Sequence, residues 1–422
     1  MGRLARALVV AILVGACTES GAPARAPDLA WDVRDAPGVV ADVAVAGDLV
    51  VAVGATAPTG DPSGRPAVWL SEDGRTWESA TIDGDGEIAA LVVGDEQHLA
   101  AGNTRAGAGT EAAVWASSDG REWTKVAGDA FAPEPGCSST RAEDIAAGTG
   151  GYVAVGTEWG GGSCGQHAAA WLSPDGRTWS RAEMAPGSHA MHNVVGGPDG
   201  YVAAGAGKAS ANEGTRGAFV FSPDGRAWTQ APDQEGLRGA EPQAVVADPL
   251  GYLAIGMAIT DLRSGAMAPA AWRSSDGRAW DRLVTEGFTW DAATTAAGQP
   301  DQQVVSMALT SELVAIPSGL LALGSGMTRR ISPDGATQQA SPWQYLAWIS
   351  DSGDTWTRVP DDPALLVGAV SWYVLGPSAA VVHDDRLLLF GTRWPASVAD
   401  QMDMTGRPTI WETDATAVGG GE

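Results

Sequence analysis

Positive charge is scarce in this 422-residue chain. Its 26 Lys and Arg face 51 Asp and Glu, so the formal net charge at pH 7 is -25. A chain this acidic repels phosphate backbones and anionic headgroups, and we therefore expect no nucleic-acid partner and no direct adsorption to a membrane surface. The hydrophobic content of 44% is nevertheless ample for a packed core, which argues against a disordered acidic polymer.

Signatures of cofactor chemistry are also missing. The sequence holds no Ser-His-Asp grouping, no phosphate-binding loop and no nucleotide fingerprint. We therefore expect no cofactor and no metal. A pair of catalytic carboxylates remains open, because folding and not sequence spacing brings such groups together in glycosidases.

The apolar run at residues 7–15 is too short to span a membrane. It follows Arg3 and Arg6 and ends at small residues before Cys17, which resembles a bacterial lipoprotein signal. This resemblance implies cleavage after residue 16 and a lipid on Cys17, the chain's only link to the membrane; an ordinary secretory peptide is the alternative. Either way we expect export, with the lipid form on the outer leaflet of the cytoplasmic membrane, facing the cell wall or extracellular space.

The exported chain divides simply. Residues 1–16 are the predicted signal peptide, and their loss removes two arginines and no acid, which changes the net charge from -25 to -27. Residues 17–27, rich in Gly, Ala, Pro and Ser, are a predicted tether. We expect one folded, monomeric domain over residues 28–417 and a disordered tail over residues 418–422.

A nine-residue pattern recurs along this domain: a tryptophan, then Ser-x-Asp-Gly-Arg, then a second tryptophan. Full copies occupy residues 69–77, 115–123, 171–179 and 272–280. Residues 220–228 lack the first tryptophan, and residues 348–356 move the acid. One structural unit is therefore repeated.

Each copy predicts a β-hairpin, because an apolar run precedes the turn and an alternating run follows it. The aspartate accepts backbone N–H groups and the glycine takes a positive φ. The predicted structural residues are Asp73, Asp119, Asp175, Asp224, Asp276, Trp77, Trp123, Trp179, Trp228, Trp280 and Trp356. The tryptophans are expected to pack between neighbouring units. Calcium-binding aspartates and an exposed aromatic array are the alternatives.

A second recurring feature is a strand that ends in glycine upstream of each hairpin. Seven such strands end at Gly54, Gly102, Gly156, Gly205, Gly256, Gly324 and Gly391. Each unit is thus predicted to hold four short antiparallel strands, with no helix in the repeats. The seventh unit lacks a fourth strand, and Ala30-Trp31-Asp32 resembles one; it would complete the last sheet and close a ring.

These hairpins resemble the Asp-box, or BNR, repeat of sialidases, sortilin-type receptors, some glucan hydrolases and photosystem assembly factors, all of them β-propellers. The resemblance covers about residues 28–415 and implies an all-β, seven-bladed propeller of four-stranded blades. Most copies here place Gly directly after Asp, one residue shorter than the usual box. The repeat indicates fold and says little about function.

Residues outside the repeat suggest a ligand site. The loops after Gly324 and Gly391 and the stretch 285–303 are long, and the resemblance implies that they share one rim. The candidate ligand-binding residues are Trp290, Arg329, Arg330, Trp343, Tyr345, Trp372, Tyr373, Arg393 and Trp394. Aromatic platforms beside arginine suit sugars or peptides. Alternatively, these tryptophans plug loops onto the blades.

Cysteine is rare: besides Cys17 only Cys137 and Cys164 occur. Both fall at the same end of the third unit, so in an exported protein they predict a disulfide. A zinc site with His167, His189 and His192 is the weaker alternative.

The sialidases provide the natural comparison for catalysis. That family's Phe/Tyr-Arg-Ile-Pro motif is missing here, so the sequence indicates no catalytic residue. The function that we expect is an exported binding or scaffolding module for a cell-envelope glycan or protein. A sialidase-like glycoside hydrolase and an assembly factor for a membrane protein are the alternatives.

Overall fold

The computed structural model describes residues 29–56, 65–208, 215–232, 235–290, 303–332, 337–339, 341–368, 377–394 and 406–418. Nearly all regular structure in these ranges is β-strand, joined by turns and by the 3-10 helices η1 (Asp129–Phe131), η2 (Glu235–Leu237) and η4 (Pro363–Leu365). The described residues contain no helix with the length and apolarity that a membrane span needs. The predicted signal, tether and Cys17 lie outside these ranges.

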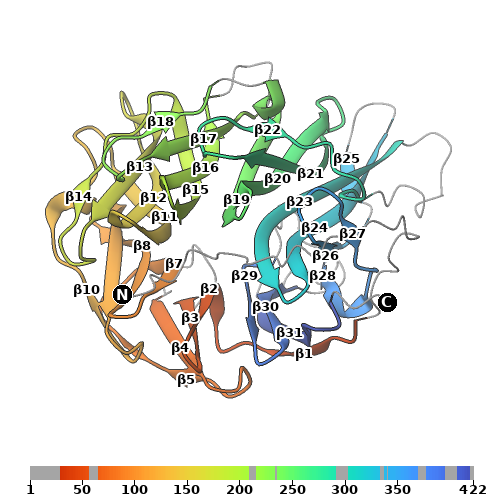
Figure 1. Ribbon diagram of the computed structural model, residues 1–422, viewed down its shortest axis with the longest axis horizontal. Helices are drawn as coiled ribbons and strands as arrows, with labels where there is room; N and C mark the ends of the chain where they lie inside the picture. Colours follow the sequence, from red (N-terminus) through yellow and green to blue (C-terminus); the bar gives the residue numbers. More distant parts are fainter. Residues whose placement is uncertain are drawn as a thin grey trace. The chain divides into compact units, whose positions relative to one another are not determined.

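The strands form antiparallel sheets that follow one another along the chain (Figure 1). The first four sheets hold β2 (Val39–Ala46), β3 (Leu49–Ala55), β4 (Pro66–Ser71) and β5 (Glu78–Ser79); β7 (Glu87–Val93), β8 (His98–Ala106), β9 (Gly109–Ser117) and β10 (Glu122–Lys125), with β6 (Thr81–Ile82) added in parallel; β11 (Ser139–Gly148), β12 (Gly151–Gly160), β13 (Gly165–Ser173) and β14 (Ser180–Arg181); and β15 (Ser188–Gly197), β16 (Gly200–Gly207), β17 (Gly217–Ser222) and β18 (Thr229–Gln230).

The later strands form a ten-stranded sheet and a four-stranded one. The larger sheet holds β19 (Ala240–Asp248), β20 (Gly251–Asp261), β21 (Ala266–Ser274), β22 (Asp281–Arg282), β23 (Gln303–Ile316), β24 (Gly319–Ile331), β25 (Thr337–Gln339), β26 (Trp343–Ser350), β27 (Thr357–Arg358) and β28 (Leu366–Gly368). One parallel bridge, between Met267 of β21 and Met307 of β23, joins its two halves.

The last sheet combines the two ends of the described chain. It holds β29 (Ala379–His383), β30 (Arg386–Arg393), β31 (Arg407–Asp414) and β1 (Asp32–Asp35). Strand β1 pairs antiparallel with β31, with Val33 opposite Trp411 (Figure 1). The N-terminal strand therefore supplies the fourth strand that the sequence predicts for this sheet, starting two residues later than Ala30.

The chain divides into two compact units. One holds Ala36–Ala254 and Arg273–Asp281, and the other holds Ile255–Trp272, Arg282–Glu422 and the stretch that includes β1. Within the first unit, β7 packs on the sheet of β2, β11 on the sheet of β7, β15 on the sheet of β11 and β19 on the sheet of β15. Successive sheets of this unit therefore stack face to face.

The hairpin turns have the predicted chemistry. Asp175 Oδ1 accepts the backbone N–H groups of Arg177 at 2.9 Å and Thr178 at 2.7 Å, and Gly176 has a φ of +71°. Those two bonds hold the pKa of Asp175 below its usual value, since they stabilise the carboxylate more than burial disfavours it. The aspartate is thus used by its own turn.

The repeat tryptophans belong to the core as expected, except Trp77, which is half-buried. Trp115, Trp171 and Trp272 are fully buried, and apolar clusters fill the space between one sheet and the next. A fully buried aromatic ring contributes about 2–3 kcal/mol through its apolar area. The alternative of an exposed array is therefore wrong for these three rings.

The glycines that the sequence places at strand ends lie inside their strands instead, as Gly102 does in β8 and Gly156 in β12, and they have a steric cause. A Cβ at Gly54, Gly102 or Gly156 would lie 2.0 Å from a carbonyl oxygen of the first strand of its own sheet. The first strand bulges directly after this contact, as at Ala142/Asp144 in β11. Only glycine permits this close approach.

Candidate functional site

The predicted ligand residues do not share one environment. The described and at least partly exposed ones are Trp290, Arg329, Arg330, Arg393 and Trp394. They come from the segment after β22, from β24 and from the end of β30, all in the second unit. Trp372 and Tyr373 lie outside the described residues.

Trp343 and Tyr345 are core residues, which corrects their assignment to a ligand surface. They are 1% and 3% exposed. The Tyr345 hydroxyl accepts the backbone N–H of Thr392 at 3.1 Å, and its ring meets Trp411 edge-on with centroids 5.0 Å apart. Neither ring faces solvent, so neither can stack on a ligand. They belong to the alternate, inward-facing positions of β26.

Trp290 packs against a strand, as the alternative predicts, and is still partly exposed. It is half-buried, and its ring lies so close to β24 that a Cβ on Gly326 would be 2.8 Å from it. The ring therefore covers the backbone of β24 with one part and meets solvent with another. Trp394 is likewise half-buried and packs against the core cluster that contains Trp343.

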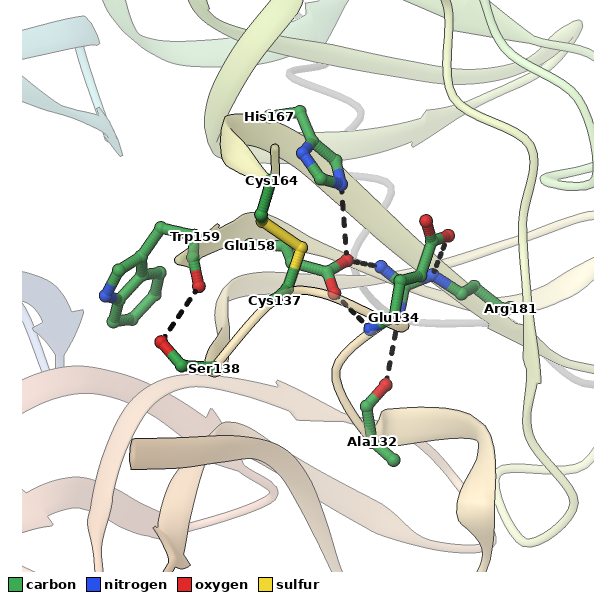
Figure 2. Close-up of a disulfide and its surroundings, with 9 residues drawn as sticks. All are labelled: Ala132, Glu134, Cys137, Ser138, Glu158, Trp159, Cys164, His167 and Arg181. Atoms are coloured by element: carbon green, nitrogen blue, oxygen red, sulfur yellow. Dashed lines mark hydrogen bonds and ion pairs between the residues drawn. A yellow bond between two sulfur atoms is a disulfide. The ribbon is translucent and has the colours of Figure 1, made fainter. Parts of the chain in front are cut away.

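A disulfide joins Cys137 and Cys164, the pair that the sequence indicates. Its S–S distance is 2.00 Å and its Cα atoms are 5.2 Å apart (Figure 2). It ties the segment before β11 to the loop between β12 and β13. The hydroxyl and N–H of Ser138 also contact the carbonyl oxygen of Trp159, the N–H at 3.1 Å. The end of the third sheet is thus fixed by covalent and hydrogen bonds.

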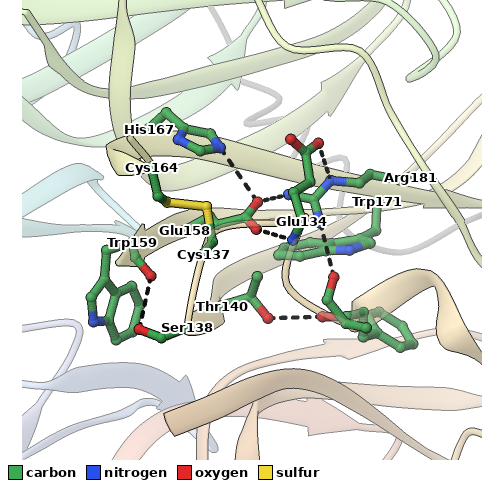
Figure 3. A network of polar contacts seen from close by, with 12 residues as sticks. Glu134, Cys137, Ser138, Thr140, Glu158, Trp159, Cys164, His167, Trp171 and Arg181 are labelled. Carbon is green, nitrogen blue, oxygen red and sulfur yellow. Dashed lines mark hydrogen bonds and ion pairs between the residues drawn. A yellow bond between two sulfur atoms is a disulfide. The ribbon is translucent and has the colours of Figure 1, made fainter. Parts of the chain in front are cut away.

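Glu158 of β12 is fully buried beneath this disulfide (Figure 3). Its carboxylate accepts the backbone N–H of Glu134 and a guanidinium N–H of Arg181, and Nε2 of His167 lies 3.4 Å away. Arg181 also contacts the Glu134 carboxylate at 3.2 Å. A buried carboxylate is costly unless it is paired, and Arg181 provides that pairing.

The charge of Arg181 survives its burial. Desolvation lowers the pKa of Arg181, and the nearby Glu134 partly opposes this effect, but arginine stays protonated in proteins. The centroid of the Trp171 ring lies 5.7 Å from the guanidinium carbon, a cation–π contact that stabilises the charge. The cluster is therefore an internal network that fixes the loop.

Metal binding by these groups is disfavoured. Donor atoms of Glu134, Glu158 and His167 lie within 4.8 Å of one another, a spacing that suits a cation. However, the Arg181 guanidinium donates to the same Glu158 oxygen that lies nearest His167, so a metal would have to displace a bound positive charge. The two sulfur atoms are oxidised and offer no thiolate ligand. The zinc alternative gains no support.

Trp159 is a residue that the sequence reasoning missed. It follows Glu158 on β12, so its side chain points to the opposite face of the sheet, and it is 37% exposed (Figure 2). It stands in no hairpin repeat and precedes three glycines and Cys164. An aromatic residue outside the repeat, next to a loop that holds a cysteine, is the sequence feature that could have identified this site.

No family model and no curated protein matches the chain. Among solved structures, it is similar to a GH43 endo-arabinanase from Bacillus licheniformis, with 12% identity over 66% of this chain and 99% of that one, at a TM-score of 0.31. It is also similar to a sucrose-6-phosphate hydrolase from Lactobacillus gasseri (12% identity, 90% and 91% coverage, TM-score 0.36) and to the WD40 β-propeller domain of Doa1 (10%, 91% and 95%, 0.45). Likenesses this weak carry no argument.

Proposed function

We propose that the chain is an exported, lipid-anchored β-propeller that binds a glycan outside the cytoplasmic membrane. Seven blades are the proposed arrangement, with β1 completing the last one. The face-to-face stacking of successive sheets in the first unit and the β1–β31 pairing support it. The Cys137–Cys164 disulfide supports an oxidising, extracytoplasmic setting.

The observation that carries binding is the exposed ring of Trp159. It stands on a strand whose neighbouring loop is fixed by a disulfide and by the buried Glu158 network. A rigid aromatic surface stacks on sugar rings at little entropic cost. Glu158 is fully buried and paired with Arg181, so it is not available as a catalytic acid.

The test is a glycan array together with fluorogenic glycosides, using the soluble chain from residue 28. We expect binding without turnover, and at least tenfold weaker binding for Trp159→Ala. The matched control is Trp77→Ala, which removes a half-buried repeat tryptophan. Turnover would instead favour a glycoside hydrolase, and crosslinking to an envelope protein without glycan binding would favour an assembly factor.

Anchoring has its own test. A clickable fatty acid supplied to cells should label the full chain and fail to label the Cys17→Ala variant. Equal labelling of both would reject the lipid anchor, and retention of both in the cytoplasm would reject export.

A further inference from the structure

The bulged position of the first strand differs in polarity from sheet to sheet. The bulge residue is Ala41 in β2 and Ala89 in β7, but Glu143 in β11 and His192 in β15. In β19 the equivalent residue is Gln243. The equivalence follows from hydrogen bonds. Asp144 accepts the N–H of Val194, two residues after His192, and Asn193 accepts the N–H of Val245, two residues after Gln243.

Alanine at two of these positions means that the bulge itself needs no polar side chain. A bulge re-aims the side chain of its extra residue, and here the re-aimed groups are half-exposed. The polar choices at Glu143, His192 and Gln243 therefore need a reason other than folding. The first unit supplies its own internal comparison for this conclusion.

These side chains and their neighbours make two groups on three adjacent strands, which together we call the polar strip: Arg141 and Glu143 on β11, and His192, Glu241 and Gln243 on β15 and β19. Nε2 of His192 lies 2.9 Å from Oε1 of Glu241, and Nε2 of Gln243 donates to the same oxygen at 3.1 Å. On β11, Arg141 Nε is 3.3 Å from Glu143 Oε2. The strands are adjacent, because Asn193 Nδ2 donates to Asp144 at 2.7 Å.

The strip is organised yet accessible. The side chains of Arg141, Glu143 and His192 are 32%, 26% and 30% exposed, and Glu241 is 17% exposed. Burial raises the pKa of Glu241, but hydrogen bonds from His192, Thr215 and Gln243 outweigh it and leave the pKa below its usual value. Glu241 is thus an ionised acceptor held in one orientation by three donors.

We propose that the polar strip binds the hydroxyl groups of a neutral glycan. This inference rests on the proposed glycan-binding function and adds a second binding site to the one proposed at Trp159. Planar carboxylate, amide and guanidinium groups match neighbouring sugar hydroxyls, which both donate and accept. The carboxylates of Glu143 and Glu241 repel anions at this surface. The strip therefore disfavours carboxylated, sulfated or phosphorylated glycans.

The test compares neutral and acidic glycans on one printed array, with the wild-type chain from residue 28 and the variants Glu143→Ala, His192→Ala and Gln243→Ala. Each variant copies the alanine that β2 and β7 already carry, so we expect the sheets to form as in the wild type. Glu241→Gln keeps size and one acceptor oxygen. Asp199→Ala, an exposed acid in the β15–β16 turn, is the control.

We expect binding of neutral glycans, at least tenfold weaker binding for His192→Ala and Glu241→Gln, and unchanged binding for Asp199→Ala. If a glycan binds and all four strip variants bind it like wild type, the strip is not the site, while the proposed function stands. If acidic glycans bind best, the ligand class is wrong. If wild type binds no glycan, the strip proposal and the glycan-binding function both fail.

Discussion

Asp144 should be one of the most stability-critical residues of the first unit, although it lies far from any hairpin turn. It is 7% exposed, and one oxygen accepts the N–H of Val194 at 2.8 Å from the next sheet and the Asn193 amide at 2.7 Å. Its other oxygen accepts the N–H of Ile145 at 2.8 Å. Asn193 passes the connection on to Val245 at 2.8 Å. Three first strands are thus joined in series.

Asp144→Ala would leave the buried N–H groups of Ile145 and Val194 without this acceptor. An unsatisfied buried donor costs about 1–3 kcal/mol, so we expect a loss of about 3–5 kcal/mol. For a unit of roughly 230 residues, each kcal/mol lowers the melting temperature by about 2–4 °C, which gives a drop of roughly 10 °C. Asp144→Asn keeps one acceptor oxygen, so we expect about half of this drop.

Calorimetry should resolve the transition of the first unit, and hydrogen exchange should report the Val194 amide directly. Because a chain with two compact units need not unfold in two states, the exchange measurement is the stricter one. The control is Asp199→Ala, which removes an exposed carboxylate from the turn between β15 and β16. A melting shift equal to that control, with Val194 protection unchanged, would refute the role assigned to Asp144.

Two further perturbations test the loop and the turns. The double variant Cys137→Ala, Cys164→Ala removes a disulfide with a sequence separation of 27, and the loss of this cross-link should cost roughly 3–4 kcal/mol of unfolding free energy. Dithiothreitol should lower the melting temperature of the wild type to that of the double variant. A wild-type melting temperature that dithiothreitol does not change would contradict this prediction. Asp175 has a folded pKa below its unfolded value of about 3.9, so its stabilisation is present above that pH and fades as the pH falls toward the folded pKa. The melting difference between wild type and Asp175→Ala should therefore shrink below about pH 4, and a constant difference from pH 7 to pH 3 would argue against the carboxylate's role.

The hairpins were predictable because each one is encoded locally. The turn needs an acceptor and a glycine within four residues, as with Asp175 and Gly176, and a tryptophan flanks it on each side. All the residues that specify the hairpin therefore lie within one short stretch of sequence. The pairing of β1 with β31 was predictable for a different reason: a unit with three strands and an orphan fourth strand at the other end leaves one sensible partner.

The connections between sheets were not predictable from the sequence. The carboxylate of Asp42 accepts the backbone N–H of Leu91, 49 residues away, and Asp144 accepts that of Val194 in the same way, but the equivalent residue in β7 is Ala90. A single polar residue inside an apolar strand carries no periodic signal. Only the bulge brings it opposite the next strand's backbone, and bulges leave no fixed sequence mark.

Two of the aromatic candidates, Trp343 and Tyr345, are buried for a related reason. Their position outside the repeat predicts ligand binding, yet both rings lie in the core beside β24, which at 13 residues is longer than the corresponding strands of the other sheets. A longer strand has more backbone and side-chain surface to bury, so additional aromatic side chains beside it pack against it. Trp159 is not predicted by loop length, because the loop after it is short. Glycines and Cys164 follow it, and its side chain is exposed.

Variation among the repeats is therefore more informative than departure from them. Where five of the six copies agree, as at the turn aspartates, the side chain is needed by the turn of its own sheet. Where copies differ and alanine is tolerated, as at Ala41 and Ala89, the backbone alone satisfies that need, and the bulge does not require a polar residue at the same position. Glu143 and His192 are such polar residues, and each is paired with a neighbour while remaining partly exposed to solvent. Their position on the surface, and not a need of the fold, is the reason to test them for ligand binding.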